Sequence, residues 1–151
     1  MQGLTFSDSK ILVVGGAGFV GSNLGCHLLE QEEIAELWIV DNLLSSDISN
    51  VRDDKRVRFL YGSITDDRIL RQLPRDMTYV YHLACYHGNQ SSIADPLADH
   101  ENNMLTSLKL FDTVKDFKSL KKVVYAAAGC AVAEKTFYEA KPTPEDAPVS
   151  L

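Results

Sequence analysis

Residues 13–21 read Val13-Val14-Gly15-Gly16-Ala17-Gly18-Phe19-Val20-Gly21. An apolar run over 11–14 precedes the glycines, and a segment with apolar residues at helical spacing follows over 19–31, which predicts a strand, a tight turn and a helix. Gly15 would permit the turn, Gly18 would let backbone N–H groups approach a diphosphate, and Gly21 would let the helix pack closely on the strand. The helix N-terminus would add N–H donors and a partial positive charge. The pattern predicts a phosphate-binding turn, and the alternative is a turn that binds nothing.

The rest of the chain alternates short apolar runs with helical patterns, which is typical of βαβ units. We expect strands at 11–14, 37–40, 57–61, 78–84 and 123–127, and helices at 19–31, from an N-cap at Thr65 to Pro74, and from Asp95-Pro96 to about 117. Residues 88–92 are expected to form a loop. The predicted fold class is therefore α/β, a Rossmann-like doubly wound parallel sheet with helices on both faces, which occupies residues 1–151.

Helical spacing also predicts which side chains are buried against this sheet. On the first helix these are Val20, Leu24 and Leu28, and on the last helix Met104, Leu108, Phe111 and Val114.

Asp41 ends the second predicted strand, about 20 residues beyond the last glycine of the turn. A carboxylate at this place accepts hydrogen bonds from the adenosine ribose hydroxyls and would repel a 2′-phosphate. No arginine stands in residues 42–46 to bind such a phosphate. NAD is therefore the predicted cofactor in preference to NADP, and the alternative role for Asp41 is that of a turn or N-cap residue.

Composition excludes several other classes of protein. The chain has 151 residues, 45% hydrophobic and 24% charged, with a net charge of −6 and no basic run, which disfavours nucleic acid and anionic membranes as partners. Cys26, Cys85 and Cys130 lack metal-ligand or paired spacing, so we expect no metal site and no disulfide, only core or near-core thiols. No secretion signal or membrane span is predicted, and a cytoplasmic location is expected.

The Gly-x-x-Gly-x-x-Gly spacing resembles the extended short-chain dehydrogenase/reductase family, especially the nucleotide-sugar epimerases and dehydratases of the UDP-glucose 4-epimerase type. Four further segments are similar in the same order, namely residues 40–46, 61–66, 82–85 and 102–107. The resemblance implies that NAD is bound by Gly15, Gly18, Phe19, Val20, Asp41, Asn42, Ser45, Ser46, Ser63, Ile64, Leu83, Ala84, Cys85, Asn103 and Ala126.

Several of these positions have a more specific implication. Ser63 replaces the aspartate that contacts adenine in the family, so the hydrogen bond to the adenine amino group is expected to be altered or lost. Asn103 is expected to hold the active-site wall. His82 is expected to pack and hydrogen-bond within the strand end and not to catalyse.

The family's catalytic residues are missing from the chain. Ala128 stands where the family has a catalytic Ser or Thr, and the nearby Cys130 has a thiol, which is a poor replacement for a hydroxyl in hydrogen bonding. No Tyr-x-x-x-Lys occurs, since Tyr138 and Lys141 are one residue too close together. The catalytic Tyr/Lys helix and a C-terminal substrate domain are therefore expected beyond residue 151. This chain, with no catalytic residue of its own, is expected to be inactive alone.

For the full-length protein the resemblance implies an NAD-dependent epimerase that acts on a nucleotide sugar, expected to be UDP-linked, and forms a homodimer. The alternatives are a dehydratase or decarboxylase of the same family, a non-catalytic NAD-binding sensor or scaffold, and an NADP-dependent reductase.

Overall fold

The computed structural model describes residues 6–86, 89–127, 144 and 146. The strands are β1 (Lys10–Val14), β2 (Glu36–Asp41), β3 (Val57–Tyr61), β4 (Tyr79–His82) and β5 (Lys122–Tyr125). The helices are α1 (Phe19–Gln31), the short 3-10 helix η1 (Ile48–Asn50), α2 (Asp67–Leu70), α3 (Asn89–Ala94), α4 (Pro96–Asp99), the π-helical segment η2 (His100–Leu105) and α5 (Thr106–Val114).

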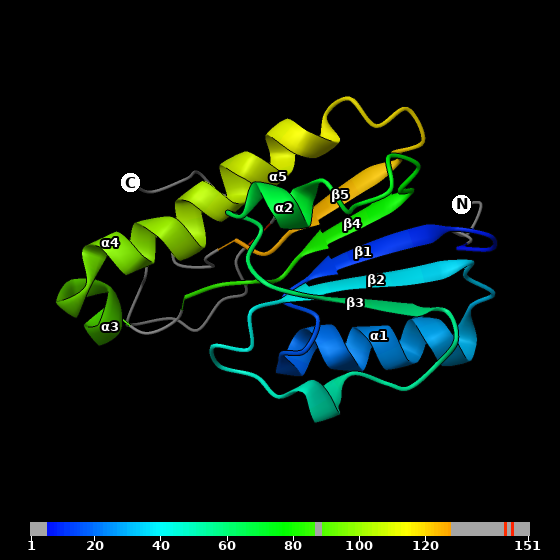
Figure 1. The fold of residues 1–151 in the computed structure, drawn as a ribbon, viewed down its shortest axis with the longest axis horizontal. Coiled ribbons are helices and arrows are strands. Elements are labelled where there is room, and N and C mark those ends of the chain that lie inside the picture. Colours follow the sequence, from blue (N-terminus) through cyan, green and yellow to red (C-terminus); the bar gives the residue numbers. More distant parts are fainter. Residues whose placement is uncertain (1–5, 87–88, 128–143, 145, 147–151) are drawn as a thin grey trace.

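All strand pairs in the described part of the chain are parallel, and the strands lie in the order β3-β2-β1-β4-β5 (Figure 1). The chain moves outward from β1 to β3 and then crosses back to β4 on the other side of β1. The connections that leave the carboxyl ends of β1 and β4 therefore lead to opposite sides of the sheet. Ligands of open parallel sheets bind at such a point. The predicted α/β fold class and parallel sheet are confirmed.

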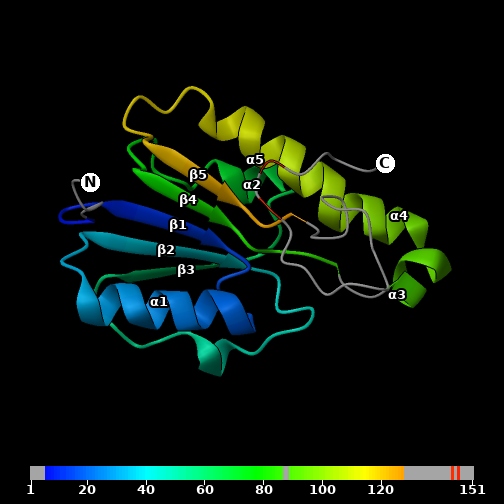
Figure 2. The same ribbon diagram turned by 180° about the vertical axis from the view of Figure 1, so that it is seen from behind.

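Both faces of the sheet are buried, and successive apolar side chains of β1 point to opposite faces. Leu12 and Val14 face the core beneath α2 and α5, whereas Ile11 and Val13 face the core beneath α1. Figures 1 and 2 show these helices on opposite sides of the sheet. Such a strand is continuously hydrophobic, as the sequence of 11–14 indicated.

The predicted buried stripe of α1 is wrong in part. Val20 is 61% exposed, and the helix buries Gly21, Gly25, Leu28 and Leu29. Gly25 lets the helix approach the sheet so closely that a Cβ there would lie 3.3 Å from Leu37 Cδ2. Gly25 therefore faces β2 and Gly21 packs on the glycine loop, whereas Val20 remains exposed.

The long helix also differs from its prediction. Its start is confirmed, since Asp95 accepts a hydrogen bond from Ala98 N and Pro96 is the first helical residue. However, the helix passes through a π-helical segment and ends at Val114. Because the π turn rotates the helical register, Thr106, Ser107, Leu110 and Val114 are buried, whereas Met104, Leu108 and Phe111 are exposed.

Three smaller predictions are also corrected. Residues 89–94 form helix α3 and not a loop. The N-cap of α2 is Asp66, which accepts from Arg68 N, and not Thr65. Strand β4 ends at His82, two residues before the expected end. No helix in the described residues has the length and hydropathy that a membrane crossing requires.

Candidate cofactor site

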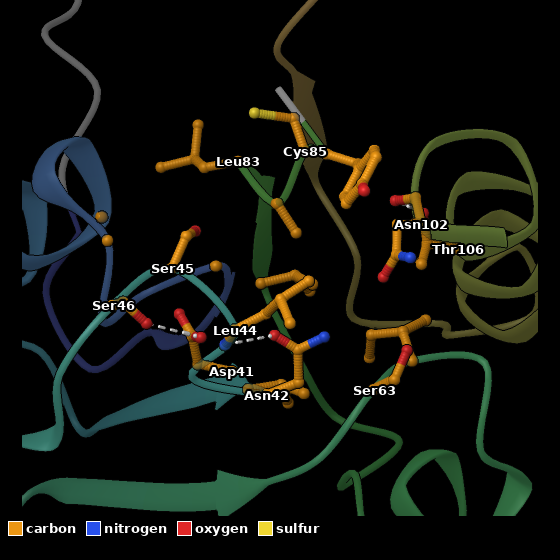
Figure 3. Close-up of a pocket in the computed structure, with 18 of the residues that line it drawn as sticks. Asp41, Asn42, Leu44, Ser45, Ser46, Ser63, Leu83, Cys85, Asn102 and Thr106 are labelled. Carbon is orange, nitrogen blue, oxygen red and sulfur yellow. Dashed lines mark hydrogen bonds between the residues drawn. The ribbon is translucent and has the colours of Figure 1, made fainter. Parts of the chain in front are cut away.

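A cavity of about 510 Å³ opens at the carboxyl ends of β1, β2, β3 and β4. It lies at the point where the strand order reverses, between β1 and β4. Its walls are the glycine loop, the segments that follow β2, β3 and β4, and residues of α3 and the η2–α5 helix (Figure 3). A volume of this size is ample for a large organic cofactor.

The glycine loop is packed too tightly for side chains at three of its positions. At Gly16 a Cβ would lie 2.6 Å from Ile39 Cγ2. Gly15 has a φ of +80°, and a Cβ there would lie 2.6 Å from Ala84 N. At Gly21 a Cβ would lie 2.6 Å from Gly16 Cα. Gly18 is different, because its φ of −71° suits any residue and its nearest obstruction would be Gly15 O at 3.3 Å. Gly18 thus keeps the cavity wall open and is not needed for the turn itself.

Asp41 joins the end of β2 to two loops. Its Oδ2 accepts from Ala17 N (2.9 Å), and its Oδ1 accepts from Leu43 N (2.9 Å) and from Ser46 Oγ (2.9 Å). A carboxylate has about four acceptor positions, so one remains on Oδ2. The side chain lines the cavity although the residue is only 9% exposed. Asp41 therefore both shapes the glycine loop and faces whatever occupies the cavity.

The loop after β2 is held in an unusual backbone conformation. Leu43 has a φ of +56°, and Asn42 Oδ1 accepts from Leu44 N (3.1 Å). Asn50 closes the glycine loop from its other side by donating from Nδ2 to Ala17 O (3.0 Å). Ser45 and Ser46 line the cavity, and the loop offers no positive charge to it.

The segment after β3 forms the far wall. Ser63 Oγ accepts from Thr65 N (3.2 Å) and from Thr65 Oγ1 (2.9 Å). Lys109 of α5 donates to Thr65 O (2.7 Å) and to Asp67 Oδ1 (2.5 Å). This interaction holds the pKa of the Asp67 carboxyl below its ordinary value. The polar edge of the cavity is thereby attached to the helix on the opposite wall.

Asn103 holds the segment after β4. Its Oδ1 accepts from Tyr86 N (2.7 Å), and its Nδ2 donates to Tyr86 O (3.1 Å) and to Asp99 Oδ1 (2.8 Å). One side chain thus satisfies both backbone groups of Tyr86, as a neighbouring strand would. Asn103 does not itself line the cavity, whereas the segment that it holds, 83–86, does.

His82 is buried beneath this wall. Ser107 Oγ donates to Asn103 O (2.7 Å), so its single proton is used and the 3.1 Å contact with His82 requires that Nε2 of His82 carry the proton. Burial lowers the pKa of His82, and its Nδ1 is the buried side-chain polar atom left without a partner among the described residues. The rings of Phe111 and Tyr125 pack edge-on against it. The geometry places a neutral, packed histidine here.

The structure brings most of the predicted site residues to one cavity. Those that line it are Gly15, Gly18, Phe19, Val20, Asp41, Asn42, Ser45, Ser46, Ser63, Ile64, Leu83, Ala84 and Cys85. Asn103 and Ala126 do not; Ala126 N donates to His82 O at the end of β5. Cys85 is exposed on the cavity wall and is not a core thiol. Ala128, Cys130, Tyr138 and Lys141 lie outside the described residues.

Sequence reasoning missed several lining residues, namely Tyr86, Ser91, Asn102 and Thr106. Asn102 and Thr106 are four residues apart and share one helix face, and this spacing could have indicated that they line the same cavity. The sequence contains no comparable signal for Tyr86 and Ser91. Among the described residues there is no group of three or more His, Cys, Asp or Glu able to hold a metal ion.

The chain matches the family model described as the NAD dependent epimerase/dehydratase family over residues 11–150. It is 53% identical to the enzyme WbmF of Bordetella bronchiseptica, whose crystal structure contains NAD+, with a TM-score of 0.79 over 91% of this chain and 41% of that one. A second structure of WbmF contains NAD+ and UDP.

Two curated relatives carry other activities in their names. A dTDP-D-glucose 4,6-dehydratase of Dictyostelium discoideum is 33% identical over 78% of this chain and 28% of its own length. A UDP-glucose 4-epimerase of Lacticaseibacillus casei is 29% identical over 93% of this chain and 41% of its own. The chain therefore spans less than half the length of these relatives. Its sequence match, parallel sheet and glycine-lined cavity show that the chain belongs to the NAD-dependent epimerase/dehydratase family.

Proposed function

We propose that this chain is the NAD-binding part of a nucleotide-sugar epimerase. The observation that carries the proposal is the pairing of an open glycine loop at the start of α1 with the Asp41 carboxylate in one cavity. The N-terminus of α1 would bind the diphosphate, and Asp41 would accept from the adenosine ribose. The nicotinamide would then lie toward the segment after β4, beside Leu83, Ala84 and Cys85.

The same arrangement supports NAD over NADP. A 2′-phosphate would lie against the Asp41 carboxylate, and residues 42–46 contain no lysine or arginine to offset the repulsion. This argues against the alternative of an NADP-dependent reductase.

NAD, when bound, supplies a hydride acceptor for a sugar carbon. The residues of this chain bind and orient it: the α1 N-terminus and Asp41 hold its position, and the segment held by Asn103 forms the wall beside the reacting end. The base that removes the sugar hydroxyl proton is proposed to lie in a Tyr/Lys helix beyond residue 151, followed by a substrate domain. Ala128 provides no hydroxyl to assist it.

Return of the hydride to the opposite face of the same sugar carbon gives an epimer, and we favour this outcome because UDP-glucose 4-epimerases recur among the relatives. A dehydratase is the second candidate, supported by the Dictyostelium relative. A UDP-linked sugar is the proposed substrate, since UDP is bound in the WbmF structure.

A non-catalytic NAD-binding sensor is the rival from a different class. It is favoured by one observation, the alanine at position 128 where the family has a hydroxyl. Turnover separates the two: an enzyme converts the sugar, whereas a sensor binds NAD and leaves the sugar unchanged.

Assembly and location complete the proposal. A homodimer is supported by exposed apolar side chains along α4–α5, namely Leu97, Met104, Leu108 and Phe111. Light scattering on native-length protein tests it, and a monomer at micromolar concentration would contradict it. The proposed location is the cytoplasm, to be checked by cell fractionation.

The decisive experiment uses native-length protein. Calorimetry is expected to show saturable NAD binding at least tenfold tighter than NADP, and NMR is expected to show conversion of UDP-glucose to UDP-galactose. A 4-keto-6-deoxy product would favour the dehydratase instead. Absence of heat and saturation with either dinucleotide would remove the basis for every version of the proposal.

A further inference from the structure

Ala17, in the middle of the glycine loop, is held by side chains at both of its backbone polar groups. The residue is fully buried. Its N–H donates to Asp41 Oδ2 (2.9 Å), and its carbonyl oxygen accepts from Nδ2 of Asn50 (3.0 Å). A carbonyl oxygen can only accept, so the Asn50 amide must present its nitrogen to it. Asp41 and Asn50 stand at the two ends of the segment 41–50, which therefore closes on this one residue of the loop.

The hydrogen bond within the glycine turn is a weak one. It runs from Gly18 N to Gly15 O over 3.3 Å, beyond the usual range for an N–H···O bond. Gly18 is also the N-cap of α1, and no side chain caps this helix end by a hydrogen bond. The path of the backbone from the turn into α1 therefore depends on bonds from outside the loop, and Asn50 supplies the bond to the Ala17 carbonyl.

The Asn50 bond acts directly on the start of α1. The peptide unit between Ala17 and Gly18 is trans and planar, so holding the Ala17 carbonyl also fixes the direction of the Gly18 N–H. The first-turn N–H groups that follow Gly18 are those proposed to bind the diphosphate. Asn50 does not line the cavity, so its influence on a ligand passes through Ala17.

Asn50 is itself held by the short η1 turn. Asp47 caps this turn by accepting from Ser49 N (2.8 Å), and Asn50 N donates to Asp47 O (3.1 Å). The Asn50 side chain thus extends from a backbone that is ordered before any ligand binds, which reduces the entropy lost when the ligand binds.

We propose that Asn50 is a positioning residue for the diphosphate, a role that rests on the proposed NAD site. It holds the glycine loop in the conformation that binds the diphosphate, whereas the ribose end of the site does not depend on it. Without Asn50, Asp41 keeps its bonds from Leu43 N and Ser46 Oγ. Loss of Asn50 should therefore weaken a ligand through its diphosphate and not through its adenosine.

The test measures adenosine, ADP and NAD as ligands of native-length protein, with NMR titration for adenosine and calorimetry for the other two. The gain in affinity from adenosine to ADP isolates the diphosphate. In Asn50→Ala this gain is expected to fall about fivefold, the factor that corresponds to one net hydrogen bond, with NAD weakened equally and adenosine changed by less than about twofold.

Two further variants separate the donor from the bulk of the side chain. Asn50→Leu is similar in size and has no donor, so it should lose the same gain as Asn50→Ala. Asn50→Gln keeps an amide donor and should recover part of the gain. Because Asn50 is exposed, these variants are expected to fold, which circular dichroism checks.

Asn23→Ala is the matched control. Asn23 also donates to a backbone carbonyl at the start of α1, that of Phe19 (2.7 Å), but this bond is exposed and lies within one helix turn, so all three affinities should stay unchanged. A wild-type gain in Asn50→Ala and Asn50→Leu, or equal weakening of adenosine and ADP, would overturn the inference and leave the NAD site intact. A wild type that binds ADP no tighter than adenosine would instead overturn the proposed function.

Discussion

Oδ2 of Asp41 lies 2.9 Å from the backbone nitrogen of Ala17, across 24 residues of sequence. The bond connects the residue expected to recognise a ribose with the loop expected to recognise a diphosphate. Two properties that sequence motifs treat separately are therefore coupled: the carboxylate proposed to select the cofactor also holds the loop proposed to bind it.

Asp41→Asn is expected to lower the free energy of unfolding by roughly 1–3 kcal/mol even without cofactor, because an amide NH2 would face one of the N–H donors of Ala17 and Leu43. Asp41→Ala should in addition weaken discrimination between NAD and NADP. Urea unfolding and calorimetry measure the two effects. Asp47→Asn is the control, since asparagine caps the η1 turn as well as aspartate does; equal stability losses in both variants would contradict the assignment.

Gly18 and Gly21 should fail in different ways when replaced by valine. Gly18→Val is expected to fold and to lose NAD binding, because the φ of Gly18 suits any residue, the nearest atom to a Cβ would be Gly15 O at 3.3 Å, and added methyl groups would narrow the cavity that Gly18 lines. Gly21→Val is expected to unfold the protein or destabilise it by several kcal/mol, because its Cβ would collide with the loop backbone. Circular dichroism and calorimetry distinguish them, and unchanged NAD affinity in folded Gly18→Val would show that the diphosphate site is misplaced.

Leu43→Asn should stabilise the protein by about 0.5–1 kcal/mol, because asparagine tolerates the left-handed conformation that Leu43 adopts at a φ of +56°. Thermal or urea unfolding measures the gain. The neighbouring Leu44→Asn serves as control, since Leu44 is 65% exposed and its φ is not positive. A loss of stability on Leu43→Asn would instead show that packing of the Leu43 side chain stabilises the fold.

Asn103→Leu is expected to release the backbone of Tyr86 and loosen the wall over 83–86. The Tyr86 amide should exchange with solvent at least tenfold faster, and NAD affinity should fall several-fold although Asn103 does not line the cavity. Hydrogen exchange by NMR on native-length protein reports the first effect directly. Unchanged exchange at Tyr86 would exclude the holding role.

His82 should make stability dependent on pH. Its folded pKa lies below the ordinary value of 6.5 because burial disfavours the charged ring, so below pH 6.5 the unfolded chain binds a proton that the folded chain does not. Stability is therefore expected to fall as the pH decreases from 6.5 toward the folded pKa, with a slope of up to about 1.4 kcal/mol per pH unit.

The comparison variant for this prediction is His82→Leu, which leaves Ser107 bonded to Asn103 O. Its urea-derived stability should have a shallower slope than the wild type between pH 5 and 6.5 and a parallel course above pH 7. Identical slopes in the two proteins would show that His82 does not titrate on unfolding.

Local sequence alone determined the strand, glycine turn and helix over 10–31, the parallel sheet, and the position of Asp41. Backbone sterics explain why. The positive φ of Gly15 favours glycine, and a Cβ at Gly21 would collide with Gly15 and Gly16 of the same loop. Continuous apolar runs such as 11–14 likewise require a sheet that is covered on both faces.

Only the tertiary structure decided which helix faces are buried and how the site is connected. Periodicity predicted Val20 and Met104 inside, but close packing at Gly25 and the π-helical turn before α5 rotated other residues toward the sheet. The bonds from Asp41 to Ala17 and from Asn103 to Tyr86 join segments 24 and 17 residues apart. Such contacts depend on the relative placement of whole elements, which side-chain spacing within one element does not encode.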